Sequence, residues 1–144
     1  MSASPLQLLL LGLVAGALAT LLFHQSAWYL LGESGVVPPD RPAWPMQAIA
    51  PLGVPSLISK MFWGGLWGAG LALVLVRIEG AAYWLAWIVV GAVAPSLVAM
   101  YVVPLIKGLP IAEFWPRAGV AATVNGAWGL GTGLFLWLFG AARS

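Results

Sequence analysis

The side chains that could do chemistry are few, and most of them lie near the ends of long apolar segments. The single histidine, His24, could ligate a haem or pigment axially or carry a proton. Lys60 could present a cation at a membrane surface, and Asn125 could hydrogen-bond between helices. Together with nearby polar residues they form one candidate functional set: His24, Gln25, Lys60, Tyr101, Lys107, Glu113, Arg117 and Asn125.

Known catalytic and metal-site patterns are missing from the sequence. It contains no Ser-His-Asp set, no paired intramembrane carboxylates and no phosphate-binding loop. The absence of cysteine excludes disulfides, thiolate metal sites and iron–sulfur clusters. We therefore predict no enzymatic activity, no metal and no cofactor. Axial ligation by His24 stays as an alternative, and interface packing or helix capping is the expected role of this residue.

The composition is typical of a polytopic membrane protein. Of the 144 residues, 62% are hydrophobic and 7% are charged, and the mean hydropathy is +0.98. Soluble domains carry about 25% charged residues, so this chain cannot cover a water-facing surface. The net charge of +2 comes from scattered residues, which argues against nucleic acid binding. The expected partners are the lipid bilayer and either a protein partner or a second copy.

Four apolar segments are long enough to cross a bilayer as helices, which requires roughly 20 residues each. They run from about 5 to 31, 56 to 76, 81 to 106 and 118 to 139, within a single domain of residues 1–144. These apolar runs are long, unbroken and show no alternation, which argues against transmembrane strands. We expect the first segment to be a retained helix, because it lacks the basic start of a signal peptide. Only residues 77–80 separate the second and third segments, so these are predicted to be antiparallel neighbours.

Prolines mark two regions of the chain. Six prolines in the segment 32–55 exclude a continuous helix there. This segment is either an ordered extramembrane loop or a lid-like, re-entrant one. Pro95 and Pro104 fall inside the third apolar segment, where each is expected to bend the helix.

The second half of the chain repeats features of the first. With an offset of 75, Gly16 and Ala19 align with Gly91 and Ala94; with an offset of 61, the Trp-Gly-x-Gly motif at residue 67 aligns with that at residue 128. The fold class predicted is therefore an all-α membrane protein with four transmembrane helices in two tandem hairpins, units 1–78 and 79–144. Such parallel repeats are related by an axis along the membrane normal.

Small residues at four-residue spacing form a stripe on the second and fourth segments. The predicted packing residues are Gly64, Gly68, Ala72, Gly129 and Gly133. Such stripes let two helix backbones approach closely in lipid. We expect each stripe to contact a neighbouring helix, and one candidate for that neighbour is the other striped helix.

The hairpin topology brings all eight candidate functional residues to the side of the membrane that carries the long loop. The orientation stays open. The distribution of Lys and Arg favours that side as cytoplasmic. A long, proline-rich loop bearing Trp44 is common on the outer face.

Three motifs resemble those of a family of small, uncharacterised bacterial four-helix inner-membrane proteins. They are Phe23-His24-Gln25, Pro51-Leu52-Gly53-Val54-Pro55 and Phe62-Trp63-Gly64-Gly65-Leu66-Trp67-Gly68. The resemblance covers most of the chain. It implies a multi-pass location in the bacterial inner membrane and implies no activity.

Two functions are compatible with these patterns. The first is a non-catalytic integral membrane protein, acting as an accessory or scaffold subunit of a membrane complex or as a homo-oligomer. The second is a small channel or transporter, with a path along the pseudo-twofold or oligomer axis.

Overall fold

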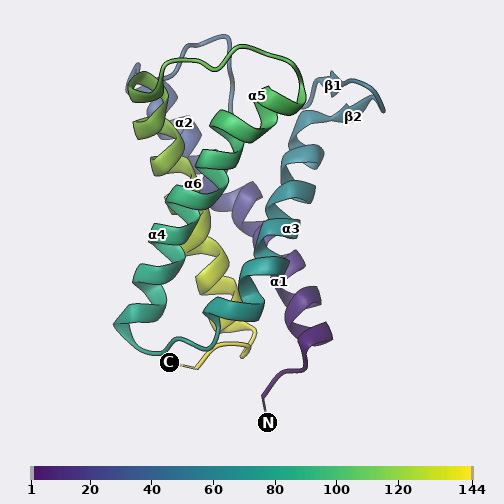
Figure 1. Cartoon of the computed structure of the whole chain (residues 1–144), viewed down its shortest axis with the longest axis vertical. Helices are drawn as coiled ribbons and strands as arrows, with labels where there is room; N and C mark the ends of the chain where they lie inside the picture. The colour runs from purple at the N-terminus through teal and green to yellow at the C-terminus, as the bar shows by residue number, and fades with distance from the viewer. Residues whose placement is uncertain (1, 144) are drawn as a thin grey trace.

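The protein is a bundle of long helices, with both chain ends at one end of the bundle and two connecting loops at the other (Figure 1). The computed structural model describes residues 2–143. The first long helix consists of α1 (Pro5–Ala19), a π-helical turn η1 (Thr20–His24) and α2 (Gln25–Glu33). Ser4 and Gln7 form a capping box at its start, and Pro5 occupies the first turn, where its missing N–H is not needed.

The proline-rich segment forms an ordered loop with a small hairpin. Its strands β1 (Ala48–Ile49) and β2 (Val54–Pro55) pair antiparallel. The helix α3 (Ser56–Leu75) follows directly. The sequence-based expectation of no continuous helix in this segment is confirmed.

The third long helix changes its hydrogen-bonding pattern between its two prolines. It comprises α4 (Ala81–Leu97), a second π-helical turn η2 (Val98–Val102) and α5 (Val103–Ile106). Pro95 lies in α4 and Pro104 in the first turn of α5. The prolines account for this change from α-helical to π-helical hydrogen bonding, because neither of them can donate a helical hydrogen bond.

The last helix, α6 (Phe114–Leu138), starts four residues earlier than predicted from its apolar run. Pro116 lies in its first turn, where a residue without an N–H is tolerated. The apolar run therefore underestimated the helix, because a polar first turn can still be helical.

Three helices are long and apolar enough to cross a membrane: Pro5–Glu33, Ser56–Leu75 and Ala81–Ile106. The helix α6 has 25 residues but is not among them. Its sequence is richer in glycine and polar residues, and many of these are buried, including Gly126, Gly129 and Thr132. The coarse prediction of an all-helical chain, with helices long and apolar enough to cross a membrane, is confirmed.

The helices pack as two close pairs, α1 with α3 and α4 with α6, and contacts between α1 and α6 join the pairs. The antiparallel neighbours α3 and α4 make few contacts with each other. The prediction that these two would pack as neighbours is therefore wrong beyond their shared turn. The short turn brings only their ends together, whereas small residues determine where backbones can approach closely.

Glycines form the contact between α1 and α3. A Cβ added to Gly12 would lie 2.5 Å from the carbonyl oxygen of Gly68, and one added to Gly68 would lie 2.9 Å from Cα of Gly16. A Cβ on Gly16 would meet the carbonyl of Gly64 even more closely. Ala72 continues this contact and is fully buried. Backbone meets backbone here, so a larger residue cannot be accommodated by a side-chain shift.

The contact between α4 and α6 has a similar geometry. A Cβ added to Gly91 would lie 2.8 Å from Cα of Gly129 and 2.9 Å from the carbonyl oxygen of Asn125. One added to Gly129 would lie against the carbonyl of Trp87, and one added to Gly133 would lie 2.9 Å from the Trp87 ring. The predicted stripes therefore mediate helix packing.

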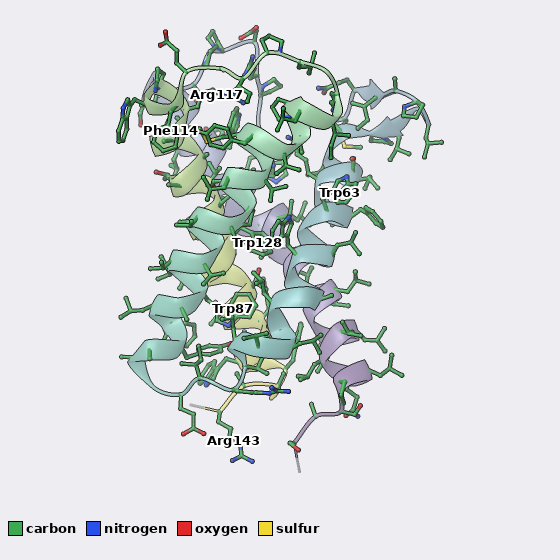
Figure 2. The ribbon with its side chains drawn as sticks, viewed as in Figure 1. Trp63, Trp87, Phe114, Arg117, Trp128 and Arg143 are labelled. Atoms are coloured by element: carbon green, nitrogen blue, oxygen red, sulfur yellow. The ribbon has the colours of Figure 1, made fainter. Side chains whose placement is uncertain are left out.

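Each stripe lies against a neighbouring helix, but the suggested contact of the two stripes with each other is wrong. The α3 stripe contacts α1 and the α6 stripe contacts α4. Among the described glycines of α3 and α6, Gly64 is the one that lies close to the opposite helix, where an added Cβ would lie 3.2 Å from Nε1 of Trp128. Trp128 and Trp87 point into the bundle, whereas Trp63 points outward (Figure 2). The indole of Trp128 instead donates to the carbonyl oxygen of Gly16 at 3.0 Å and links α6 to α1.

Candidate functional site

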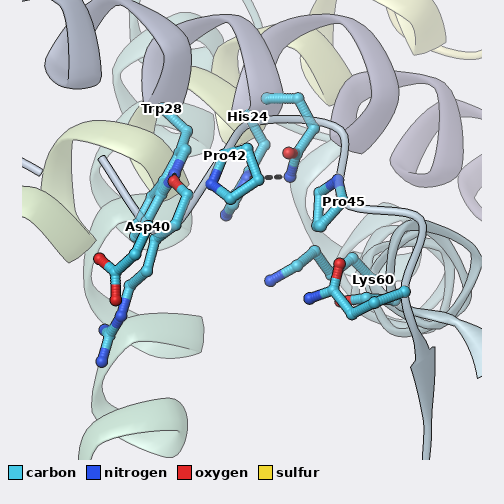
Figure 3. A pocket seen from close by; sticks show the side chains of 10 residues that line it. His24, Trp28, Asp40, Pro42, Pro45 and Lys60 are labelled. Atoms are coloured by element: carbon cyan, nitrogen blue, oxygen red, sulfur yellow. Dashed lines mark hydrogen bonds between the residues drawn. The ribbon is translucent and has the colours of Figure 1, made fainter. Parts of the chain in front are cut away.

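A cavity of about 260 Å³ lies at the loop end of the bundle, between the first long helix, the proline-rich loop and the start of α3. Three of the predicted residues, His24, Gln25 and Lys60, line it. Figure 3 shows Trp28 and Asp40 on one side of the cavity and Lys60 on the other, with His24 between them. Its remaining lining residues come from the loop and its junction with α3: Arg41, Pro42, Pro45, Gln47 and Ser56.

The loop is attached to the first long helix through two tryptophans. The backbone N–H of Trp44 donates to Oε1 of Gln25 at 2.8 Å, and its indole Nε1 donates to the carbonyl oxygen of Leu21 at 2.8 Å. The indole of Trp28 donates to the carbonyl oxygen of Arg41 at 2.8 Å. Trp44 has a positive φ of 49°, which is uncommon for a residue with a side chain. These hydrogen bonds stabilise that conformation and close one wall of the cavity.

The loop is also attached to α3. The backbone N–H groups of Ser56 and Leu57 donate to the carbonyl oxygens of Gln47 and Pro45 at 2.9 and 2.8 Å. These are two of the N–H groups that a helix cannot satisfy internally at its start. The loop therefore caps α3 with its own backbone.

Gln25 determines which tautomer the neutral His24 ring adopts. Gln25 is 2% exposed, and its Nε2 lies 3.1 Å from Nδ1 of His24. Since the Trp44 N–H can only donate, the Gln25 oxygen must face it and the amide NH₂ must face His24. Nδ1 of His24 is then an acceptor, so Nε2 carries the ring proton. His24 thus keeps one N–H donor that Gln25 does not use.

The charged residues of the cavity give it a formal charge of +1. Lys60 and Arg41 are positive, Asp40 is negative, and His24 in this tautomer is neutral. Gln25, Gln47 and Ser56 add neutral polar groups. The arrangement can bind a small anion by charge and hydrogen bonding. Among residues 2–143, no group of three or more His, Cys, Asp or Glu is arranged to hold a metal ion.

The other predicted residues do not line this cavity. The Tyr101 ring stacks on Phe114 at 6.4 Å between centroids, and it is half-buried. Lys107, Glu113 and Arg117 are exposed around the loop between α5 and α6. Arg117 lies at the loop end and Arg143 at the opposite end (Figure 2).

Asn125 lies between helices. Its Nδ2 donates to Oγ of Ser96 at 2.9 Å, which joins α6 to α4. This is the interhelical hydrogen bond that its depth in the sequence predicted. The eight predicted residues are therefore not one cluster, because three line the cavity and Asn125 belongs to the packing between helices.

Sequence reasoning missed the contribution of the loop to this site. The loop residues Asp40, Arg41 and Gln47 line the cavity together with Trp28 of α2, whereas the sequence alone predicts only an ordered or lid-like segment here. One signal was available: Trp44 and neighbouring prolines make the loop bulky and stiff, so it can pack on helices.

A second hollow, of about 580 Å³, lies at the other end of the bundle, between the start of α1 and the residues that follow α6. Its lining includes Ser4, Gln7, Leu10 and Phe139 and no charged side chain. It offers no arrangement of groups that would select a ligand.

Comparisons of the chain with protein family models, with curated proteins and with solved structures found no match.

Proposed function

We propose that the protein is a non-catalytic membrane protein that acts as an accessory or scaffold subunit of a larger membrane complex, or assembles with itself. The main support is that buried polar side chains of the helices form hydrogen bonds to backbone carbonyl oxygens within the bundle. Tyr83 donates to the carbonyl oxygen of Gly133 at 2.6 Å, Thr132 to that of Trp128 at 2.9 Å and Thr20 to that of Gly16 at 2.9 Å. The Tyr83 hydrogen bond joins α4 to α6, and those of the two threonines lie within a single helix.

The interior of the bundle therefore offers little polar chemistry. Among the described residues, Trp87 Nε1 is the one buried side-chain nitrogen or oxygen without a hydrogen-bond partner. An indole N–H neither accepts nor transfers protons at ordinary pH. A role in packing and assembly fits such an interior better than catalysis does.

We further propose that α6 is a fourth transmembrane helix. Its 25 residues extend about 37 Å, and a bilayer core is about 30 Å thick. The helix contacts α1, α2 and α4, so its glycine-rich faces meet protein and need not be apolar for lipid. Both termini lie at one end of the bundle, as an even number of crossings requires (Figure 1).

Single-cysteine variants can test this topology, because the chain has no cysteine of its own. We expect Ser34→Cys and Leu109→Cys to react with a membrane-impermeant maleimide from one side of the membrane. Glu79→Cys and Arg143→Cys should react from the other side. Labelling of Arg143→Cys on the side of Leu109→Cys would reduce the crossings to three.

The tandem duplication is part of the same proposal. Gly16 and Gly91, aligned by the offset of 75, each face a carbonyl, that of Gly64 and that of Asn125. Gly68 and Gly129, aligned by the offset of 61, face the carbonyls of Gly12 and Trp87. The facing residues are themselves aligned by the same two offsets. This agreement between two interfaces supports two parallel hairpin units.

A native purification tests the assembly role. Tagged protein extracted from its own membrane in mild detergent should elute as a complex larger than the 15.1 kDa chain in its micelle. Chemical crosslinking before extraction should trap the same assembly. A monomer without a crosslinked partner would overturn the proposal. A bacterial inner-membrane location rests on the resemblance of the Phe-His-Gln and Phe-Trp-Gly-Gly-Leu-Trp-Gly motifs, and membrane fractionation tests it.

A channel or transporter is the second candidate, and the π-helical turns favour it. Both η1 and η2 interrupt long helices towards the loop end, and such turns are frequent at functional sites. The two helix pairs are joined mainly through α1 and α6, so a displacement of α3 relative to α4 would break few contacts. Liposome flux measurements on the wild type, Lys60→Ala and Asn125→Leu test this candidate. Absence of flux in the wild type would end it.

A further inference from the structure

We propose that the cavity lined by His24, Gln25 and Lys60 binds the phosphate group of a small phosphate ester, such as a lipid headgroup. Its volume of about 260 Å³ lies just below the range of roughly 300–1,000 Å³ typical of small-molecule pockets. The cavity therefore suits a single anionic headgroup and is too small for a nucleotide or a cofactor with a large ring. The proposal does not depend on the assembly role proposed above.

The charges of the cavity favour an anion. Lys60 and Arg41 approach it from different elements, α3 and the loop, and Asp40 offsets one of the two positive charges. The remaining formal charge of +1 would neutralise the single negative charge of a phosphate diester. Arg41 and Lys60 are both exposed residues, so a ligand can reach them from outside the bundle.

Neutral donors complete the site. With Nδ1 of His24 accepting from Gln25, Nε2–H of His24 is a donor that the loop does not use. Ser56, the first residue of α3, adds a hydroxyl to the lining. Buried Gln25 holds His24 on one side and the loop on the other, so the donors are oriented before a ligand binds.

The position of the cavity fits a lipid headgroup. It lies at the loop end of the bundle, between the last third of the first long helix and the start of α3, and Figure 3 shows the side chains that line it. A phosphate at this level could belong to a phospholipid whose chains lie along the helices. Free phosphate would use the same groups, so the experiment must separate the two sources.

The test measures ligand binding to the full-length protein in detergent by isothermal titration. The probes are dioctanoyl phosphatidylglycerol, dioctanoylglycerol, which lacks the phosphate, and inorganic phosphate. We expect saturable binding of the phosphatidylglycerol and none of the dioctanoylglycerol. Lys60→Gln should weaken binding by roughly 10- to 100-fold, since a charge-assisted contact is lost.

Two further variants make the result specific. Asp40→Asn should tighten binding, because it removes the one negative charge of the cavity. Lys107→Gln removes an exposed charge from the same end of the bundle without touching the cavity and should leave the Kd unchanged. Thermal unfolding of each variant verifies that it is folded.

The outcomes are distinct. Binding of inorganic phosphate with the same dependence on Lys60 would support the site and identify free phosphate as its ligand source. Equal binding of dioctanoylglycerol, absence of phosphatidylglycerol and phosphate binding, or equal effects of Lys60→Gln and Lys107→Gln would each overturn the proposal.

Discussion

In both close helix pairs the two backbones come into direct contact at glycines, but the side chains next to these contacts differ. In the pair α1–α3, the aligned positions 12 and 64 are both glycine, and backbones meet directly. In the pair α4–α6, the same positions are Trp87 and Asn125. The second pair also has two side-chain hydrogen bonds between its helices, from Tyr83 to Gly133 and from Asn125 to Ser96.

This difference shows that close helix approach needs small residues at only a few positions. Gly16 with Gly68, and Gly91 with Gly129, are the positions that both pairs share. The neighbouring aligned positions vary more widely, because they are glycine in the first pair and Trp87 and Asn125 in the second. The first pair therefore depends on dispersion between backbones, and the second adds hydrogen bonds worth about 0.6–2 kcal/mol each.

The largest expected effect comes from filling the shared positions. Gly68→Leu and Gly129→Leu should each lower the free energy of unfolding by at least about 3 kcal/mol, because rigid backbone opposes the new side chain. Thermal unfolding in detergent measures this. The matched controls are Gly70→Leu on α3 and Gly119→Leu on α6, where an added Cβ meets nothing within 4 Å. If controls and test variants lost equal stability, close approach would not explain the packing.

Exchanging residues between the pairs tests how far they differ. Gly64→Asn introduces the side chain of the aligned Asn125 into the α1–α3 contact, where its Cβ would lie 3.1 Å from the carbonyl oxygen of Gly16 and closer still to Thr20. We expect a loss of about 1–3 kcal/mol from overpacking. The reverse variant, Asn125→Gly, should cost less in thermal stability. A larger loss from Asn125→Gly would mean that the hydrogen bond of Asn125 in the second pair outweighs the steric cost of Gly64→Asn in the first.

Removing a hydrogen bond should have a smaller effect, confined to the second pair. Tyr83→Phe deletes the buried 2.6 Å hydrogen bond to Gly133 and should cost about 1–1.5 kcal/mol. Tyr101→Phe, at a half-buried position in η2, is the control. For Asn125, a double-mutant cycle with Ser96→Ala isolates the pair contribution. Additive losses in that cycle would exclude a direct contribution of this hydrogen bond.

The smallest global effect is expected at the loop. Trp44→Phe removes the indole hydrogen bond to Leu21 but keeps the backbone hydrogen bond to Gln25. We expect an unchanged unfolding temperature and roughly a tenfold faster amide exchange in residues 32–55, for a local loss of about 1.4 kcal/mol. Trp115→Phe, at a residue that is 83% exposed, is the control. Unchanged exchange in the Trp44 variant would show that the loop is held by other contacts.

Composition and the lengths of the apolar runs were sufficient to predict the helices. The first three segments were predicted within two residues of their observed ends, because lipid requires long apolar runs and prolines mark where they stop. Gly68 and Gly129 were recognised as packing residues for a similar reason: small residues at four-residue spacing lie on one helix face. These are local properties, and they can be read along the chain.

Which helices pair, and which polar groups meet, depended on tertiary structure. The stripes of α3 and α6 could have contacted each other, and their actual partners α1 and α4 follow from how all the helices fit together. The same holds for the cavity. His24 and Lys60 are 36 residues apart, and Arg41 reaches them only because Trp44 and Trp28 hold the loop on the first helix. Contacts across such distances carry no periodicity in the sequence, so they arise only when the chain is folded.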